Sequence, residues 1–415
     1  MDKLQDKLSF KDDFPPVSNE EWEKKIQQDL KGLDYNKKLI WKTKEGFNIR
    51  PYYNSEDLKK IHHLNIRPGE FPWLRGKNIR ANDWFIRQDV DAKGDTSTAN
   101  IKALSALSKG ASSIRFLIDE NQPPDCHQFE QLLKGICIPS LDLNFQSGHC
   151  SIEMVELLKK KLKKDSIEQA NVKGSVNYNP LGCLNRQGCF CSSTNNVFDE
   201  AGRLIEKAFE LPGFSALEVD AAWIHNAGSN IVQELGFALA MGSDYLAFLT
   251  HRGFKVNQIA ESIQFSFGIG PAYFLEIAKL RAARMLWAKV VEAYEPTHLK
   301  STQMKIHAET MRWNQTSYDP NVNILRGTTE AMSAALGGAD SITVTPYDLP
   351  FEEPTPFAER LARNTQIIIK EEAHFDRVVD PAGGSYYIEE LTQSIAKHAW
   401  RLFQEVENHG GYLEA

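Results

Sequence analysis

Short runs of β-forming residues alternate with helix-length intervals along most of the chain. Eight such runs follow one another from about residue 80: Trp84–Val90, Ser112–Ile118, Leu141–Gln146, Gly174–Pro180, Ser215–Trp223, Ser262–Gly270, Lys305–Trp313 and Asp340–Asp348. Eight β/α units predict an α/β fold whose parallel strands close into a (β/α)8 TIM barrel. An open doubly wound sheet is disfavoured, because no G-x-G-x-x-G phosphate loop follows any of these runs.

Two of the longer intervals carry helix-start signals. After Gly270-Pro271, apolar residues recur every three or four positions as far as Val291, and the proline is expected in the first helical turn. Ser385 ends a D-P-A-G-G-S turn and is expected to cap a helix that runs through Trp400. These helices should cover the barrel wall.

The first 46 residues differ from the rest of the chain. We expect residues 1–46 to form a helical N-terminal arm and residues 47–415 to form the barrel. Between Asn19 and Gly32 the pattern is helical, with an apolar stripe made by Trp22, Ile26, Leu30 and Leu33. Such a stripe must lie on something, either on the chain's own barrel or on another subunit.

Composition and charge argue against nucleic acid, a membrane and a metal ion as partners of this chain. The chain has 48 Lys and Arg against 55 Asp and Glu, a net charge of −7, so it offers no basic field for nucleic acid. A charged N-terminus and the lack of a long apolar run predict a cytoplasmic protein that does not enter a membrane. The six cysteines are scattered, and the cluster CLNRQGCFC (Cys183 to Cys191) lacks paired C-x-x-C spacing, so we expect no metal site.

Five longer motifs are spread along the barrel region. They are PGEFPWLRG (Pro68 to Gly76), FIRQ (Phe85 to Gln88), EIAKLRAARMLWAK (Glu276 to Lys289), RNTQ (Arg363 to Gln366) and DPAGGSYYIEELT (Asp380 to Thr392). Over roughly residues 45 to 410 the chain resembles the substrate-binding barrel of the cobalamin-dependent acyl-CoA mutases, of which methylmalonyl-CoA mutase is the type. It looks most like the small, non-catalytic subunit of that family.

The resemblance implies a chemistry that this chain lacks the residues to perform. In catalytic members, a deoxyadenosyl radical released from the cofactor abstracts hydrogen from the acyl-CoA, and the carbon skeleton rearranges. Those members place a tyrosine after the I-R-Q motif and a histidine on the thioester carbonyl, where this chain has Asp89 and Trp223. Aspartate has no ring to shield a radical and brings its charge beside an anionic substrate, and an indole fills the space that the thioester needs.

Further positions at the expected barrel opening depart from the family in the same way. The family's Q-N-D segment reads Asn177-Tyr178-Asn179, Arg312 replaces a small residue in the T-S-G-W segment, and Tyr318 replaces a glutamine. Asn82 and Phe85 stand where catalytic subunits hold CoA with arginine and threonine. We therefore expect no catalytic residue in this chain and an opening degraded at Asp89, Asn177, Trp223, Arg312 and Tyr318.

His225 is one remaining candidate for the missing histidine. If the strand continues that far, His225 shares a face with Trp223, because strand side chains alternate. Its position just ahead of a helix favours a local capping or hydrogen-bonding role instead.

The resemblance also implies where the cofactor binds. Family members that hold cobalamin use a D-x-H-x-x-G loop in a separate domain, and the nearest string here, Trp223-x-His225-x-x-Gly228, lacks the aspartate that orients the imidazole. We expect no cobalamin-binding domain and no cofactor-binding or metal-binding residue in this chain. Adenosylcobalamin and acyl-CoA would be bound by a catalytic mutase subunit that pairs with this chain as a heterodimer.

Two other functions remain open at this point. The chain could be the catalytic barrel of a split acyl-CoA mutase that works with a separate cobalamin-binding polypeptide and uses His225 or Trp223 on the thioester. It could also be a barrel that binds CoA esters without chemistry, although the CoA-facing arginine is missing.

Overall fold

The structure is a computed structural model that describes residues 13–15, 17–190 and 192–415. It divides the chain into two compact units, one that runs to Tyr53 and one that comprises Asn54–Ala415. Part of the expected arm, residues 1–12, lies outside the described residues, as does Cys191.

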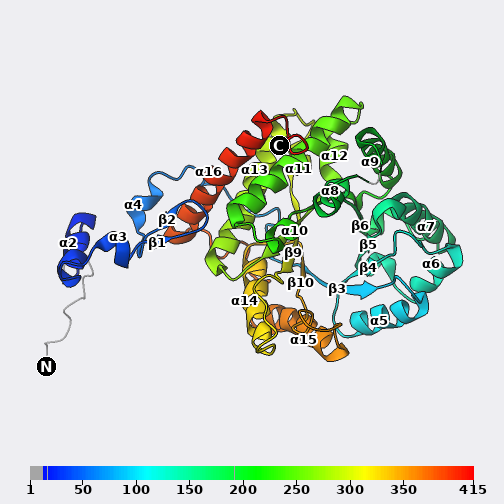
Figure 1. Cartoon of the computed structure of the whole chain (residues 1–415), viewed down its shortest axis with the longest axis horizontal. Coiled ribbons are helices and arrows are strands. Elements are labelled where there is room, and N and C mark those ends of the chain that lie inside the picture. Colours follow the sequence, from blue (N-terminus) through cyan, green and yellow to red (C-terminus); the bar gives the residue numbers. More distant parts are fainter. Residues whose placement is uncertain (1–12, 16, 191) are drawn as a thin grey trace, which may run out of the picture. The chain divides into compact units, whose positions relative to one another are not determined.

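The described residues of the first unit include helices α2 and α3 and a small sheet (Figure 1). Helix α2 (Asn19–Asp29) begins with a capping box, in which Ser18 and Glu21 satisfy each other's backbone N–H groups. Helix α3 (Tyr35–Lys38) precedes the antiparallel pair β1 (Trp41–Lys42) and β2 (Asn48–Ile49). The helical stretch is shorter than expected, because α2 ends at Asp29 and leaves Leu33 beyond it.

The predicted barrel is confirmed in the second unit. Eight parallel strands pair in the closed order β10-β3-β4-β5-β6-β7-β8-β9, and β10 closes the ring by pairing with both β9 and β3 (Figure 1). Each strand overlaps one of the eight predicted runs, and the bounds differ by a few residues at the ends. The strands are β3 (Phe85–Asp91), β4 (Ser113–Leu117), β5 (Asp142–Gln146), β6 (Lys173–Tyr178), β7 (Gly213–Asp220), β8 (Ile263–Ile269), β9 (Lys305–Thr310) and β10 (Ser341–Thr343).

Helices surround the barrel, and α13 packs against both α11 and α16. The principal helices are α4 (Ser55–Leu58), α5 (Thr96–Ser108), α6 (Cys126–Leu132), α7 (Ser151–Lys164), α8 (Pro180–Gln187), α9 (Thr194–Ala208), α10 (Ala221–Asn226), α11 (Ile231–His251), α12 (Val256–Glu261), α13 (Tyr273–Glu292), α14 (Val322–Leu336), α15 (Pro356–Ile367) and α16 (Tyr386–Asn408).

Two details of the predicted helix starts need correction. Pro271 lies outside α13, because Ala272 is the N-cap residue and the helix begins at Tyr273. Ser385 does occupy the N-cap position of α16, but its side chain makes no capping hydrogen bond. Instead, the carboxylate of Glu389 in the first turn accepts from the backbone N–H of Gly384 at 2.8 Å.

The five sequence motifs contact one another in the barrel wall. Guanidinium groups of one motif donate to carboxylate, amide or backbone oxygens of another. The pairs are Arg281–Glu389 at 2.8 Å, Arg75–Asp380 at 2.7 Å, Arg363–Gln88 at 2.7 Å and Arg284 with the carbonyl of Trp73 at 3.1 Å. These residues hold the wall together.

Candidate functional site at the barrel mouth

The site is the mouth of the barrel, defined as the carboxyl ends of strands β3–β10 and the loops that follow them. In this architecture the side chains at these ends carry the chemistry, because eight loops converge there. Strand side chains alternate between the barrel interior and the surrounding helices. Asp89 on β3, Asn177 on β6 and Glu309 on β9 therefore face inward near the mouth.

Below the mouth, the barrel axis is filled by a buried polar network. The guanidinium of Arg87, 2% exposed, donates to Asp142 at 2.9 Å and to Asn144 at 3.1 Å. Ser113 donates to the same Asp142 carboxylate at 2.8 Å. Burial alone would raise the pKa of Asp142, but Arg87 and these hydrogen bonds hold it at about 2, so the carboxylate stays ionised.

Asp89 is neutralised by an arginine on the neighbouring strand. Arg115 on β4 donates from Nε to Asp89 Oδ1 at 2.8 Å and reaches Glu309 at 3.3 Å. Arg312, in the loop after β9, also donates to Glu309, at 3.1 Å. The negative charge of Asp89, expected beside a substrate, is thus paired with Arg115. Arg115 is in turn not available to bind an anionic ligand.

Asn177 and Glu218 form a second polar group on the other side of the mouth. Asn177 adopts a left-handed backbone with φ of 47° and donates from Nδ2 to Glu218 Oε1 at 3.1 Å. Ser266 on β8 donates to the same oxygen at 2.6 Å. Burial, followed by the negative charge of Asp220, raises the pKa of Glu218 to about 7.

Trp223 and His225 lie on a helix, so the expected strand continuation is wrong. Strand β7 ends at Asp220, whose side chain caps α10 by accepting from the N–H of Trp223 at 3.0 Å. Helical residues two apart do not share a face, and the two side chains diverge. Trp223 is 36% exposed, whereas His225 is 7% exposed.

His225 belongs to a buried ionic cluster behind the mouth. Its Nδ1 lies 2.7 Å from Glu234 Oε2, and Lys279 donates to that oxygen at 2.6 Å. Burial alone would lower the pKa of His225, but the Glu234 carboxylate raises it. Glu234 orients this imidazole through Nδ1, as the missing aspartate would, but the His225 side chain is buried and is not presented to a cofactor.

Two cavities open at the mouth. The larger, about 550 Å³, lies between the ends of β4–β7 and helix α8, and its lining includes Asn177 and Glu218. The smaller, about 260 Å³, lies by β3, β9 and β10, and its lining includes Asp89 and Arg312. Trp223, His225 and Tyr318 line neither cavity, and the Tyr318 side chain is 99% exposed.

Asn82 and Phe85 lie away from the mouth, where β3 begins. Asn82 donates from Nδ2 to the carbonyl of Ala335 at 2.7 Å and to that of Phe375 at 3.2 Å. Phe85 is the first residue of β3 and pairs with Ser341. Neither lines either of the two mouth cavities.

Sequence reasoning missed several residues that shape the mouth. Arg115, Glu218, His149 and Arg186 all line a cavity or neutralise a lining carboxylate. The available signal was alternation, since Arg115 and Glu218 are polar residues inside otherwise apolar predicted strands. Within the ranges that the structure describes, no group of three or more His, Cys, Asp or Glu could hold a metal ion.

The fold and the site define a class of protein: a (β/α)8 barrel whose mouth carries charged side chains, several of which bind one another. The methylmalonyl-CoA mutase family model matches residues 125–415, and the chain belongs to this family. It is 42% identical over 408 residues to the methylmalonyl-CoA mutase small subunit of Porphyromonas gingivalis, covering 97% of this chain and 65% of that protein.

Other relatives agree with this assignment. The small subunit of Streptomyces virginiae is 33% identical, with 99% of this chain and 67% of that protein covered. The large subunit from the same organism is 28% identical, with 97% and 58% covered. The chain thus spans about two thirds or less of the length of these curated relatives. In its described part, no helix has the length and apolarity to cross a membrane.

Proposed function

We propose that this chain is the small, non-catalytic subunit of a methylmalonyl-CoA mutase, which interconverts methylmalonyl-CoA and succinyl-CoA. It pairs with a catalytic subunit in a heterodimer and stabilises it, and the partner binds both acyl-CoA and adenosylcobalamin. The cytoplasm is the compartment that suits the free cysteines of the described residues.

One observation carries this proposal: the charged groups around Asp89, on the β3 and β9 side of the mouth, are engaged in internal ion pairs. Asp89 and Glu309 share Arg115, and Arg312 also donates to Glu309. An anionic acyl-CoA would have to break these partly buried ion pairs before it could bind. The loss of the tyrosine and the histidine at Asp89 and Trp223 points the same way.

The apolar stripe of the first unit is the surface we assign to the partner. All eleven residues of α2 are described, and none is buried. Trp22 is 48% exposed even though its ring stacks on that of Tyr52 at 5.0 Å. An exposed tryptophan on an amphipathic helix is a typical anchor at a subunit interface.

Reconstitution with the catalytic homologue tests the proposal. The two chains are mixed at micromolar concentration, their mass is read by light scattering, and methylmalonyl-CoA turnover is followed with adenosylcobalamin present. We expect a one-to-one complex that turns over substrate, and no turnover by this chain with cofactor alone. A chain that stays monomeric beside its homologue would contradict the proposal.

The split-mutase alternative gives a different result in the same assay. It predicts turnover when this chain is combined with a cobalamin-binding domain that has no barrel of its own. No described contact favours it, since His225 is held by Glu234 and Trp223 lines neither mouth cavity.

A further inference from the structure

The larger mouth cavity contains a buried carboxyl group that is not paired with a cation. Glu218 is 5% exposed, and its Oε1 accepts only from the neutral groups of Asn177 and Ser266. Across the described part of the chain, no Lys, Arg or His nitrogen forms an ion pair with it within 4.0 Å. Buried carboxylates ordinarily acquire such a partner, because an unpaired charge is costly away from water.

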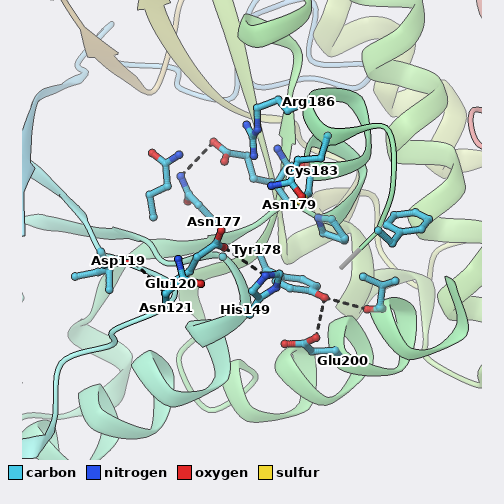
Figure 2. A pocket seen from close by; sticks show the side chains of 18 of the residues that line it. Asp119, Glu120, Asn121, His149, Asn177, Tyr178, Asn179, Cys183, Arg186 and Glu200 are labelled. Atoms are coloured by element: carbon cyan, nitrogen blue, oxygen red, sulfur yellow. Dashed lines mark hydrogen bonds and ion pairs between the residues drawn. The ribbon is translucent and has the colours of Figure 1, made fainter. Parts of the chain in front are cut away.

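Beside Glu218 lies an unused hydrogen-bond acceptor. Asn177 is 3% exposed, and because its Nδ2 donates to Glu218, its Oδ1 is the free end of the amide (Figure 2). That Oδ1 is buried and has no hydrogen-bond partner. A buried, unsatisfied side-chain acceptor is uncommon in folded proteins and calls for a donor from a ligand or water.

The lining as a whole is negative and partly apolar. Four carboxylates face the cavity, those of Asp119, Glu120, Glu200 and Glu218, against the two cations Lys93 and Arg186. Arg186 is already engaged with Asp220 at 3.3 Å. Tyr178, Pro180 and Phe190 supply an apolar wall on which methylene groups can lie.

We propose that this cavity binds a small organic cation, whose primary ammonium group donates to the Glu218 carboxylate and to Asn177 Oδ1. An ammonium group has three donors and one positive charge, so it supplies both the charge and the hydrogen bond that the cavity lacks. The volume of about 550 Å³ is in the range of small-molecule sites. This ligand class differs from the anionic acyl-CoA of the family reaction, and the site does not depend on the proposed subunit role.

A divalent metal ion is a poorer occupant of the same cavity. The carboxylates there do not gather into a ligand set, since the described residues contain no group of three or more candidate ligands. Calcium and magnesium need several oxygens converging on one point. A molecule with an ammonium end and an alkyl body matches the single carboxylate, the single amide oxygen and the apolar wall.

Three four-carbon compounds with cationic, neutral and anionic end groups test the site. Putrescine, butane-1,4-diol and succinate are titrated separately into the full chain at pH 8, where Glu218 is ionised, and binding is followed by saturation-transfer NMR and calorimetry. We expect association only with putrescine, at least tenfold tighter than with the diol. Equal binding of the diol, tighter binding of succinate, or no putrescine binding up to millimolar concentration would overturn the proposal.

Two substitutions locate the binding to these side chains. Glu218→Gln keeps the acceptor for Asn177 and Ser266 but removes the charge, and it should weaken putrescine binding about tenfold or more. Asn177→Gly suits the left-handed backbone and removes the Oδ1 acceptor, so it should weaken binding severalfold. Glu210→Gln, on a carboxylate outside this cavity, serves as the control. Unchanged binding in folded Glu218→Gln protein would contradict the assignment.

Discussion

Two carboxyl groups at the mouth have opposite kinds of partner. Asp89 is balanced by the guanidinium of Arg115, which is nearly buried. Glu218 has only neutral partners, and burial together with Asp220 raises its pKa to about 7. The first carboxylate depends on its ion pair, whereas the second can exchange a proton near neutral pH.

Glu218 should make the folded state less stable as the pH rises. The pKa of Glu218 is about 7 in the folded chain, against an ordinary value of 4.5. The protonated side chain therefore adds to the free energy of unfolding in full below pH 4.5, and this contribution is lost as the pH rises through about 7. This shift corresponds to about 3 kcal/mol. Glu218→Gln should therefore be close to wild type at pH 4.5 and more stable than wild type at pH 8, as measured by urea unfolding. A difference in unfolding free energy that does not change with pH would contradict this.

Arg115 should be more important for stability than Arg312, although both donate to Glu309. The side chain of Arg115 is 8% exposed and that of Arg312 is 55% exposed. Arg115→Met leaves Asp89 and Glu309 without their shared cation and should cost about 3 to 5 kcal/mol. Arg312→Met should cost less than about 1 kcal/mol, because exposed pairs contribute little. Equal losses in urea unfolding would show that the buried pair is not the stronger one.

Among the secondary-structure elements, the strands could be predicted best. The alternation of β-rich runs and helical intervals located all eight strands, since packing around a closed barrel repeats the same pattern. The short helix α10 was missed, because Asp220 ends β7 and starts α10 with a single capping bond. Trp223, which the predicted run included, and His225, which would have shared its face had the strand continued, lie on this helix instead.

Only part of the site could be predicted from the sequence. Asp89 and Asn177 could be located, because they lie beside a long motif or inside a predicted strand. The partners that define their chemistry could not, since Arg115 and Glu309 are 194 residues apart and meet only when the barrel closes. A pattern of neighbouring residues in the sequence cannot predict a contact over this separation.

Close packing between α11, α13 and β8 should make Gly242 intolerant of a side chain. An added Cβ would lie 2.7 Å from the ring of Trp287 and 3.0 Å from that of Phe265. Gly242→Ala should therefore cost about 1 to 3 kcal/mol by overpacking. Gly94→Ala is the matched control, because nothing lies within 4 Å of its added Cβ. Thermal unfolding of the two variants checks this, and similar melting temperatures would contradict it.

For the chain as a whole, the arm should matter for assembly and the barrel for its own stability. Trp22→Ser removes an exposed aromatic anchor from α2 and should weaken binding to the catalytic subunit at least tenfold. Lys25→Ser, on a side chain that is 69% exposed in the same helix, should change binding less than twofold. Light scattering over a concentration series measures both affinities, and equal effects would argue against the stripe as the contact.

The central claim is that this chain supports catalysis without performing it. The most direct test is methylmalonyl-CoA turnover by the reconstituted complex in which this chain carries Asp89→Asn and Trp223→Ala together. The account predicts a turnover rate within twofold of wild type and an unchanged complex mass. A loss of tenfold or more at unchanged mass would place catalytic residues in this chain and contradict the account.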